Sequence, residues 1–175
     1  MPDANITKSA LARALKRLMA EKDFQKISVT DICEKCGMNR KSFYYHFKDK
    51  YDLMNWIFYT EFITMVTTKE MESGWDLLRN VMEMFYGDRS FYLSAIQTEG
   101  QNSFTEYFHE SMIPIISFLF DDIVSENGSG KMLVHIFADA CLLAALRWLQ
   151  DGCPETPEVF VENLKKLIKK IASTI

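Results

Sequence analysis

The spacing of apolar residues most constrains how this chain folds. Apolar side chains recur at steps of three and four residues along almost the whole sequence, as in the run Ile6, Ala10, Leu11, Ala14, Leu15 and Leu18. A stripe with this period forms one face of an amphipathic helix. No segment beyond residue 70 alternates as a half-buried strand does, and Gly and Pro number only 7 and 4 in 175 residues. The sequence therefore predicts an all-α protein.

Capping residues and glycines divide the first part of the chain into four helices. Thr7 is a candidate N-cap for the first helix, over residues 6–20. Ser28 begins a capping-box pattern with an acidic residue at its fourth place, and the helix that it opens ends at Gly37. Asn39 and Asp49 are suited to capping a third and a fourth helix. The predicted spans are 28–36, 40–47 and 50–62.

The rest of the chain is also predicted to be helical. Loop signals at 127–130 and 152–157 separate the later segments, and Pro114 predicts a kink or a break within one of them. The predicted spans are 74–86, 90–98, 102–121, 131–150 and 157–174.

Charge is distributed unevenly along the chain. Residues 1–50 carry 11 Lys and Arg against 6 Asp and Glu, a net charge of +5, whereas residues 51–175 carry 9 against 18, a net charge of −9. A basic head concentrates attraction for phosphate, and an acidic body discourages non-specific binding elsewhere. The asymmetry is suggestive of a nucleic-acid-binding segment over 1–50 and a separate body over 51–175, but it is not specific.

The second and third predicted helices suit a helix-turn-helix. A tight turn at 37–39 joins them, and apolar residues including Ile32, Phe43 and Phe47 supply the inner side. The outward side of the third helix has no acidic residue. It consists of Arg40, Lys41, Ser42, Tyr44, Tyr45 and His46. Such side chains donate hydrogen bonds to guanine edges and phosphate oxygens, so this face is predicted to read DNA.

The run from Ile27 to Leu53, ISVTDICEKCGMNRKSFYYHFKDKYDL, resembles the DNA-binding domain of TetR/AcrR-family transcription regulators. The resemblance implies base contacts from the start of the recognition helix, backbone contacts from its later tyrosines and histidine, and packing by its phenylalanines. It further implies phosphate contacts by Ser28, Thr30 and Lys50. Three shorter runs, 6–8, 38–40 and 53–57, resemble most the subgroup of the dihydroxyacetone-kinase operon regulator.

The same resemblance implies about nine helices, divided into a DNA-binding domain over 1–50 and a regulatory and dimerisation domain over 51–175. The last two helices pair with those of a second subunit as a four-helix bundle, and the two recognition helices of the dimer read a palindromic operator. The sequence supports this independently, because residues 132–149 are apolar nearly all round and a small monomer has little protein to cover them. The candidate dimer residues are Leu143, Leu146, Phe160, Leu164, Leu167, Ile168 and Ile171. Packing within the chain remains an alternative for this stripe.

The middle of the body is where members of this family often bind an effector. Aromatic residues at helical spacing are more often core than ligand pocket, so the candidates Phe85, Tyr107, Phe118 and His135 are a hypothesis. The leading hypothesis is a dimeric operator-binding regulator, in most such proteins a repressor. The alternative is a DNA-binding regulator whose acidic body docks a protein partner and takes no small molecule.

Other functions lack support in the sequence. No nucleophile elbow, phosphate-binding glycine loop or metal triad occurs, so we expect neither an enzyme nor a cofactor. Cys33 and Cys36 lack a second ligand pair at zinc-finger spacing and are interpreted as small packing residues, with no metal expected. With no signal peptide after Met1 and no apolar run of about 18 residues, the expected location is the cytoplasm.

Overall fold

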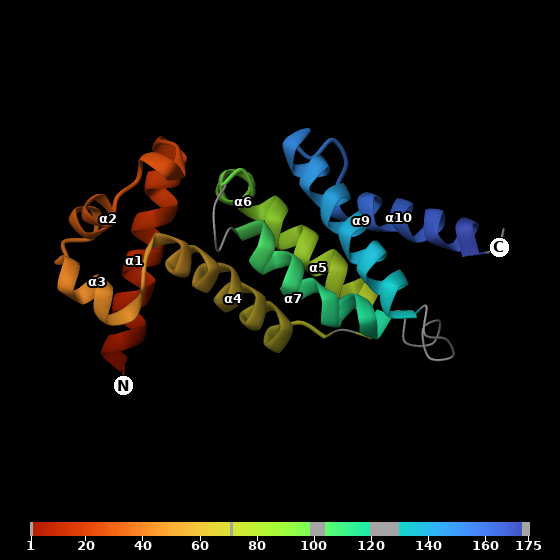
Figure 1. Cartoon of the computed structure of the whole chain (residues 1–175), viewed down its shortest axis with the longest axis horizontal. Coiled ribbons are helices and arrows are strands. Elements are labelled where there is room, and N and C mark those ends of the chain that lie inside the picture. Colours follow the sequence, from red (N-terminus) through yellow and green to blue (C-terminus); the bar gives the residue numbers. More distant parts are fainter. Residues whose placement is uncertain (1, 71, 99–103, 120–129, 173–175) are drawn as a thin grey trace. The chain divides into compact units, whose positions relative to one another are not determined.

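The computed structural model describes residues 2–70, 72–98, 104–119 and 130–172, and all of its regular structure there is helical. The prediction of an all-α fold is confirmed. The helices, labelled as in Figure 1, are α1 (Pro2–Glu21), α2 (Val29–Lys35), α3 (Arg40–His46), α4 (Lys50–Thr68), α5 (Gly74–Gly87), α6 (Arg89–Ile96), α7 (Phe104–Leu119), α9 (Gly130–Gln150) and α10 (Pro157–Ala172), with a short 3₁₀ turn η1 (Phe24–Lys26).

The predicted caps of α2, α3 and α4 are present. The amide of Asp31 donates to Ser28 Oγ at 3.1 Å, and the Ser28 amide donates to Asp31 Oδ2 at 2.7 Å, which completes a capping box. Asn39 Oδ1 accepts from the Ser42 amide at 2.8 Å. Asp49 Oδ1 accepts two amides of the first turn of α4, each at 2.9 Å. These side chains satisfy amides that the helices leave unpaired.

One predicted cap is absent, and one predicted irregularity is not a break. Thr7 does not cap the first helix, because α1 begins at Pro2, whose fixed φ suits the first helical position. At Pro114 the sequence predicted a kink or a break, and α7 continues through the proline without a break. A proline inside a helix removes one hydrogen bond, and a long helix tolerates that loss by bending.

The described chain divides into two compact units. The first combines Met1–Ile63 with Ser90–Phe108, and the second combines Thr64–Arg89 with His109–Ile175. Fully buried side chains of the first unit include Leu11, Leu15, Ile32, Phe43 and Leu53. The DNA-binding domain predicted over 1–50 lies wholly within the first unit, and its boundary at residue 50 stays a prediction.

The second unit is built around α5. Helices α9 and α10 both pack against α5. The side chains that they bury include Leu78, Met82, Ala145, Trp148 and Val161. Trp148 lies between two rings, with its centroid 6.1 Å from that of Tyr86 and 5.4 Å from that of Phe160. This packing holds the predicted dimer helices to the body.

Candidate nucleic-acid interface

Helices α2 and α3 pack together as the predicted helix-turn-helix. Ile32 and Cys33 on α2 and Phe43 on α3 are buried, and the Phe47 ring lies 5.8 Å from the Phe43 ring. Between the helices, Gly37 has a φ of +69°, a left-handed conformation that glycine adopts without strain. The amide of Met38 closes the turn on the Cys33 carbonyl at 2.9 Å. Helix α1 contacts both helices, so α3 is held from behind.

The opposite face of α3 is open to solvent, as the sequence predicted. Arg40 and Lys41 are exposed, and the tyrosines at 44 and 45 are 51% and 83% exposed. Exposed apolar side chains that are adjacent, unlike single ones, are typical of a surface that a partner covers. A guanidinium nitrogen of Arg40 lies 3.5 Å from the Tyr44 hydroxyl. The exposed side of α3 therefore combines cationic groups, hydroxyl groups and aromatic rings in one continuous surface.

A hollow of about 280 Å³ adjoins this surface. Its lining is Thr7, Asn39, Lys41, Ser42, Tyr45 and His46. No carboxylate lines the hollow, and hydroxyl, amide and ammonium groups surround it. The hollow is therefore suited to a phosphate group of a nucleic-acid backbone. Thr7 was missed as a site residue in the sequence, because only the packing of α1 against α3 brings it there.

The start of α2 holds an ionised carboxylate. Hydrogen bonds from the Ser28 backbone and hydroxyl, with a further contribution from Lys22, lower the pKa of Asp31 to about 2. The Ser28 hydroxyl donates a hydrogen bond to Asp31 Oδ2 at 2.7 Å, so it is already engaged. Thr30 is exposed and has no hydrogen-bond partner among the described residues. Of the two predicted phosphate contacts here, Thr30 is the more available.

Lys50 is half-buried and fully engaged. Its Nζ donates to the carbonyls of Phe24 and Ile27, each at 2.8 Å, and to that of Gln25 at 3.1 Å. The ammonium also lies 4.5 Å from the centre of the Phe24 ring. Burial lowers the pKa of Lys50, and Asp31 opposes that shift. All three N–H donors are in use, so the phosphate contact implied by the family resemblance would require these bonds to break.

The predicted dimer residues differ in exposure. Leu143 on α9 is 62% exposed and Leu167 on α10 is exposed as well. Leu146, Phe160 and Leu164 are half-buried, and the side chains of Ile168 and Ile171 lie outside the described residues. Met132 and Ile136 of α9, which the sequence analysis did not single out, are also exposed. At spacings of four and seven residues, they extend the Leu143 face along α9.

The predicted ligand residues occupy unlike environments. Phe85 is fully buried in α5, and Tyr107 packs edge-on against Phe58 with the ring centroids 6.0 Å apart. His135 is exposed on α9, and the Phe118 side chain lies outside the described residues. The burial of Phe85 suits a core residue. The effector hypothesis for these positions stays a prediction.

The cysteine pair packs as the sequence suggested. Cys33 is buried, and Cys36 is half-buried with its thiol 3.2 Å from the Ile32 carbonyl. Burial raises the pKa of both thiols. Within the described ranges, no group of three or more His, Cys, Asp and Glu is placed to hold a metal ion. In the same ranges, no helix has the length and apolarity needed to cross a membrane.

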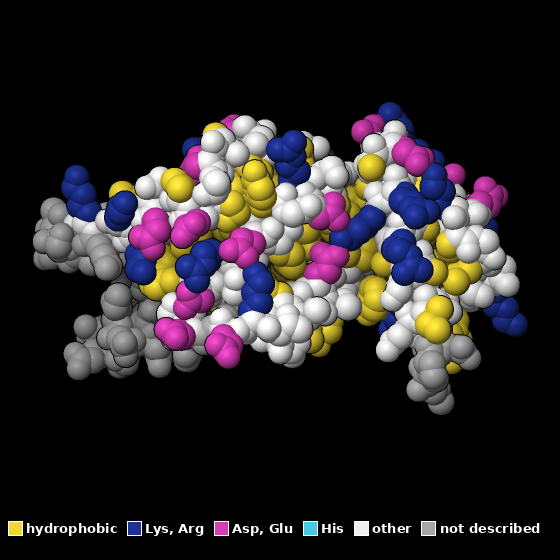
Figure 2. All heavy atoms as spheres, turned by 180° about the vertical axis from the view of Figure 1, so that it is seen from behind, with side chains coloured by type: hydrophobic (Ala, Val, Ile, Leu, Met, Phe, Trp, Pro, Cys, Tyr) yellow, Lys and Arg dark blue, Asp and Glu magenta, His cyan; other side chains and the backbone are white. Residues whose placement is uncertain are grey.

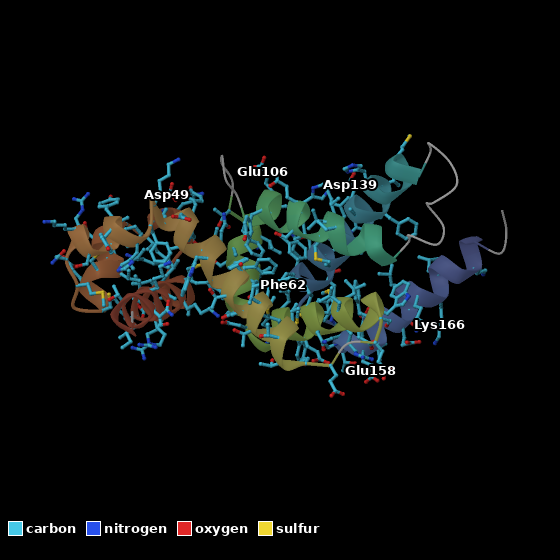
Figure 3. The ribbon with its side chains drawn as sticks, turned by 90° about the horizontal axis from the view of Figure 1, so that it is seen from below. Asp49, Phe62, Glu106, Asp139, Glu158 and Lys166 are labelled. Atoms are coloured by element: carbon cyan, nitrogen blue, oxygen red, sulfur yellow. The ribbon has the colours of Figure 1, made fainter. Side chains whose placement is uncertain are left out.

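Charged side chains of both signs are mixed on the face shown in Figure 2, over the head as well as over the rest of the chain. In the body, Asp139 of α9 pairs with His109 Nε2 at 2.6 Å, and Glu158 and Lys166 lie on α10 (Figure 3). The excess of Lys and Arg over Asp and Glu in residues 1–50 gives the head a net charge of +5.

Comparison with known proteins places this geometry in a family. Residues 7–56 match the family described as bacterial regulatory proteins, tetR family, and residues 75–170 match a C-terminal region of transcriptional regulators from the same family. The chain is 32% identical over 75 residues to DhaS of Lactococcus lactis, the transcriptional activator of the dhaKLM operon. That match spans 43% of this chain and 40% of that regulator.

Solved structures share the fold over nearly the whole chain. A structure of the dihydroxyacetone kinase operon activator DhaS superposes with a TM-score of 0.72 at 18% identity, covering 97% of this chain and 98% of that one. NalD of Pseudomonas aeruginosa, the secondary repressor of a multidrug efflux pump, gives 0.71 at 18% identity and covers 97% of both chains. The chain belongs to the TetR family of transcription regulators and is a DNA-binding regulator rather than an enzyme.

Proposed function

We propose that this chain binds operator DNA as a homodimer and thereby controls transcription, with α3 as the recognition helix. The observation that carries the proposal is the face of α3, on which cationic, hydroxyl and aromatic side chains stand exposed with no carboxylate among them. Arg40, Lys41 and Ser42 approach base edges. Tyr44, Tyr45 and His46 contact backbone, sugar or a thymine methyl group.

The phosphate contacts follow from hydrogen-bond availability. Thr30 and the hollow beside Thr7 and Asn39 take backbone phosphates. Ser28 contributes through its capped helix start, whereas Lys50 acts by holding the turn before α2 in place. This assignment departs from the phosphate contact that the family resemblance implies for Lys50.

A dimer places two recognition helices on one palindromic operator, about 34 Å apart, which is one turn of B-DNA. The exposed apolar residues of α9 and α10 supply the subunit interface. Leu143, Met132 and Ile136 on α9 and Leu167 on α10 each present apolar surface to solvent in a single chain. Burying that surface against a second copy removes it from water.

We infer repression as the mode of regulation. A bound dimer that covers a promoter blocks transcription by occupancy alone and needs no further contact. The names of the similar proteins include both an activator and a repressor, so a reporter assay decides. Deleting the gene should raise transcription from the operator; a fall in transcription would identify an activator. Bacterial operators lie in the cytoplasm, and the chain acts there.

Fluorescence anisotropy with the promoter fragment next to the gene tests the DNA contacts. Arg40→Ala should weaken specific binding by about 5- to 150-fold, the loss expected for one good base contact. Arg89→Ala, an exposed arginine at the start of α6, is the matched control and should bind as the unaltered protein does. Equal affinities for all three proteins on specific and scrambled DNA would contradict the assignment.

Control by an effector and control by a protein partner remain distinct proposals. The net charge of −9 over residues 51–175 favours a partner with a basic surface. A thermal-shift screen of metabolites separates the two. A metabolite that raises Tm and also releases the operator supports an effector bound in the body. Operator release only by a copurifying protein supports the partner.

A further inference from the structure

A groove separate from the DNA-reading surface lies between α1 and α4, within the first compact unit. It encloses about 290 Å³ and is lined from α1 by Ser9, Arg13 and Lys16 and from α4 by Trp56, Thr60 and other residues of the same face. No residue of α2 or α3 lines it. Its volume is close to the lower limit for small-molecule sites in proteins.

The base of the groove is apolar and already shaped. Ile57 is buried and Trp56 is half-buried. The Trp56 ring is held in place by the Phe47 ring, with centroids 5.6 Å apart, and by the Lys8 ammonium 5.5 Å from its centre. Around this apolar floor the lining is mostly polar or charged, and an apolar floor with polar groups placed to orient a ligand is the usual pattern of a ligand site.

The charges at the rim are unequal. Lys16 forms an ion pair with Glu61, whose other carboxylate oxygen accepts a hydrogen bond from the Tyr92 hydroxyl at 2.5 Å. These two charges therefore offset each other. Arg13 is exposed and has no ion-pair or hydrogen-bond partner among the described residues. The groove thus offers one guanidinium that an anion would match.

We propose that this groove binds an anionic amphipathic small molecule, such as an aromatic carboxylate or sulfonate. The apolar body of the ligand lies on Ile57 and against Trp56, and its acid group pairs with Arg13. A guanidinium binds such acids through two parallel hydrogen bonds. Thr60 also lines the groove, and its hydroxyl can orient the ligand by a hydrogen bond. This site lies in the head and is independent of the effector hypothesis for the body.

The probe for the test is 8-anilino-1-naphthalenesulfonate, which combines an aromatic body with one permanent negative charge. Titration into the isotope-labelled, DNA-free protein is followed through the indole N–H resonances of Trp56, Trp75 and Trp148. Trp56→Phe identifies the resonance of the groove. We expect the Trp56 signal to move saturably, whatever happens at the other two.

Two arginines one turn apart on α1 provide a matched pair of variants. Arg13→Gln should weaken binding of the probe at Trp56 by about tenfold or more, because it removes the charge-assisted pairing with the sulfonate. Arg17→Gln should leave it unchanged, because Arg17 is exposed on the same helix but does not line the groove. Both positions are exposed, so neither variant should alter Tm appreciably.

Naphthalene serves as the neutral comparator. It should bind at Trp56 more weakly than the sulfonate, and Arg13→Gln should not affect it. The proposal is overturned if the sulfonate leaves the Trp56 resonance unmoved, or if Arg13→Gln and Arg17→Gln change its affinity equally. The experiment contains no DNA, so failure of operator binding would not affect its outcome.

Discussion

Lys50 shows how one side chain organises the entry to the DNA-reading helices. It joins the first turn of α4 to three carbonyls around η1, just before the capping box of α2. A buried carbonyl that loses its hydrogen-bond donor lowers the stability of the folded protein, because its desolvation is no longer compensated by a hydrogen bond. Lys50 is therefore expected to contribute to stability and to the placement of α2.

Replacing Lys50 should destabilise the protein. Lys50→Met removes all three hydrogen bonds, and we expect the free energy of unfolding in urea to fall by about 1–3 kcal/mol. Lys48→Met, an exposed lysine two residues earlier, should change it by less than about 0.5 kcal/mol. If both variants unfold at the same urea concentration as the unaltered protein, Lys50 has no such structural role.

Asp31 makes stability depend on acid pH. Its pKa is about 2 in the folded protein, below the ordinary value of 3.8, chiefly because the Ser28 amide and hydroxyl donate to it. A carboxyl with a lowered folded pKa stabilises fully above its unfolded pKa and loses that contribution as the pH falls. Stability should therefore decline between about pH 4 and pH 2.

Thermal unfolding across that range checks the expectation. Asp31→Asn should flatten the decline in Tm between pH 4 and pH 2 and should lower Tm at pH 7. Glu34→Gln, on the exposed side of the same helix, should leave the pH profile of Tm in place. An unchanged profile in Asp31→Asn would show that other carboxyls account for the acid sensitivity.

Residue roles that depend on local sequence could be predicted, and those that depend on tertiary contact could not. Ser28, Asn39 and Asp49 cap helices that begin one residue later, so their role is visible in a few adjacent letters. The partners of Lys50 lie 23 to 26 residues away. Only the fold brings them within hydrogen-bond distance, whereas the family resemblance had implied a phosphate contact for this lysine.

Among the elements, α4 is tied to α1 and α6 through one carboxylate. Glu61 on α4 pairs with Lys16 of α1 and accepts from the fully buried Tyr92 of α6. The Lys16 ammonium also lies 4.7 Å from the centre of the Phe91 ring. Three helices from distant parts of the sequence therefore meet at a single polar contact within the first unit.

The contribution of the Tyr92–Glu61 hydrogen bond to stability should be measurable by removing the Tyr92 hydroxyl. Tyr92→Phe is expected to lower the free energy of unfolding by about 1–2 kcal/mol, because the hydroxyl is buried and bonded to a charged group. Tyr59→Phe, at an exposed position on α4, should have almost no effect. A double-mutant cycle with Glu61→Gln should show coupling between the two positions; strict additivity would mean that the hydrogen bond contributes nothing.

Helix identity was easier to predict than helix length. Caps and apolar spacing located every described helix, because both signals are local. The start of α1 and the end of α4 were placed too far inward. Residues 63–68 are ITMVTT, a β-branched stretch with weak helix propensity, and packing of Met65 in the folded chain overrides that preference.

For the whole molecule, the exposed apolar face of α9 predicts self-association. Leu143→Glu places a charge within that face, and light scattering after size exclusion should show a shift from dimer toward monomer, because burying an unpaired charge is costly. Ile6→Glu, which alters an exposed apolar residue in the head, should leave the dimer intact. A monomer in the unaltered protein at micromolar concentration would contradict the proposed interface.

The general architecture and family could be inferred from the sequence, since the capped helices and the motif from Ile27 to Leu53 specify both. The effector hypothesis was the least accessible part. Phe85, Tyr107 and His135 share helical spacing and aromatic character, yet one is core, one is half-buried and one is exposed. Which side of a helix faces a cavity depends on neighbouring helices, and periodicity within one helix does not report it.

The two faces of α3 have a consequence for how such a protein changes over evolutionary time. Phe43 and the adjoining Phe47 are buried and carry the fold, whereas Arg40, Lys41, Tyr44 and Tyr45 project away from the core. Under the proposed DNA contacts, mutations on the outer side alter the preferred operator at little cost in stability. A duplicated gene could therefore acquire a new set of target promoters through a few substitutions on the exposed side of α3. The fold and the dimer interface of its product would not change.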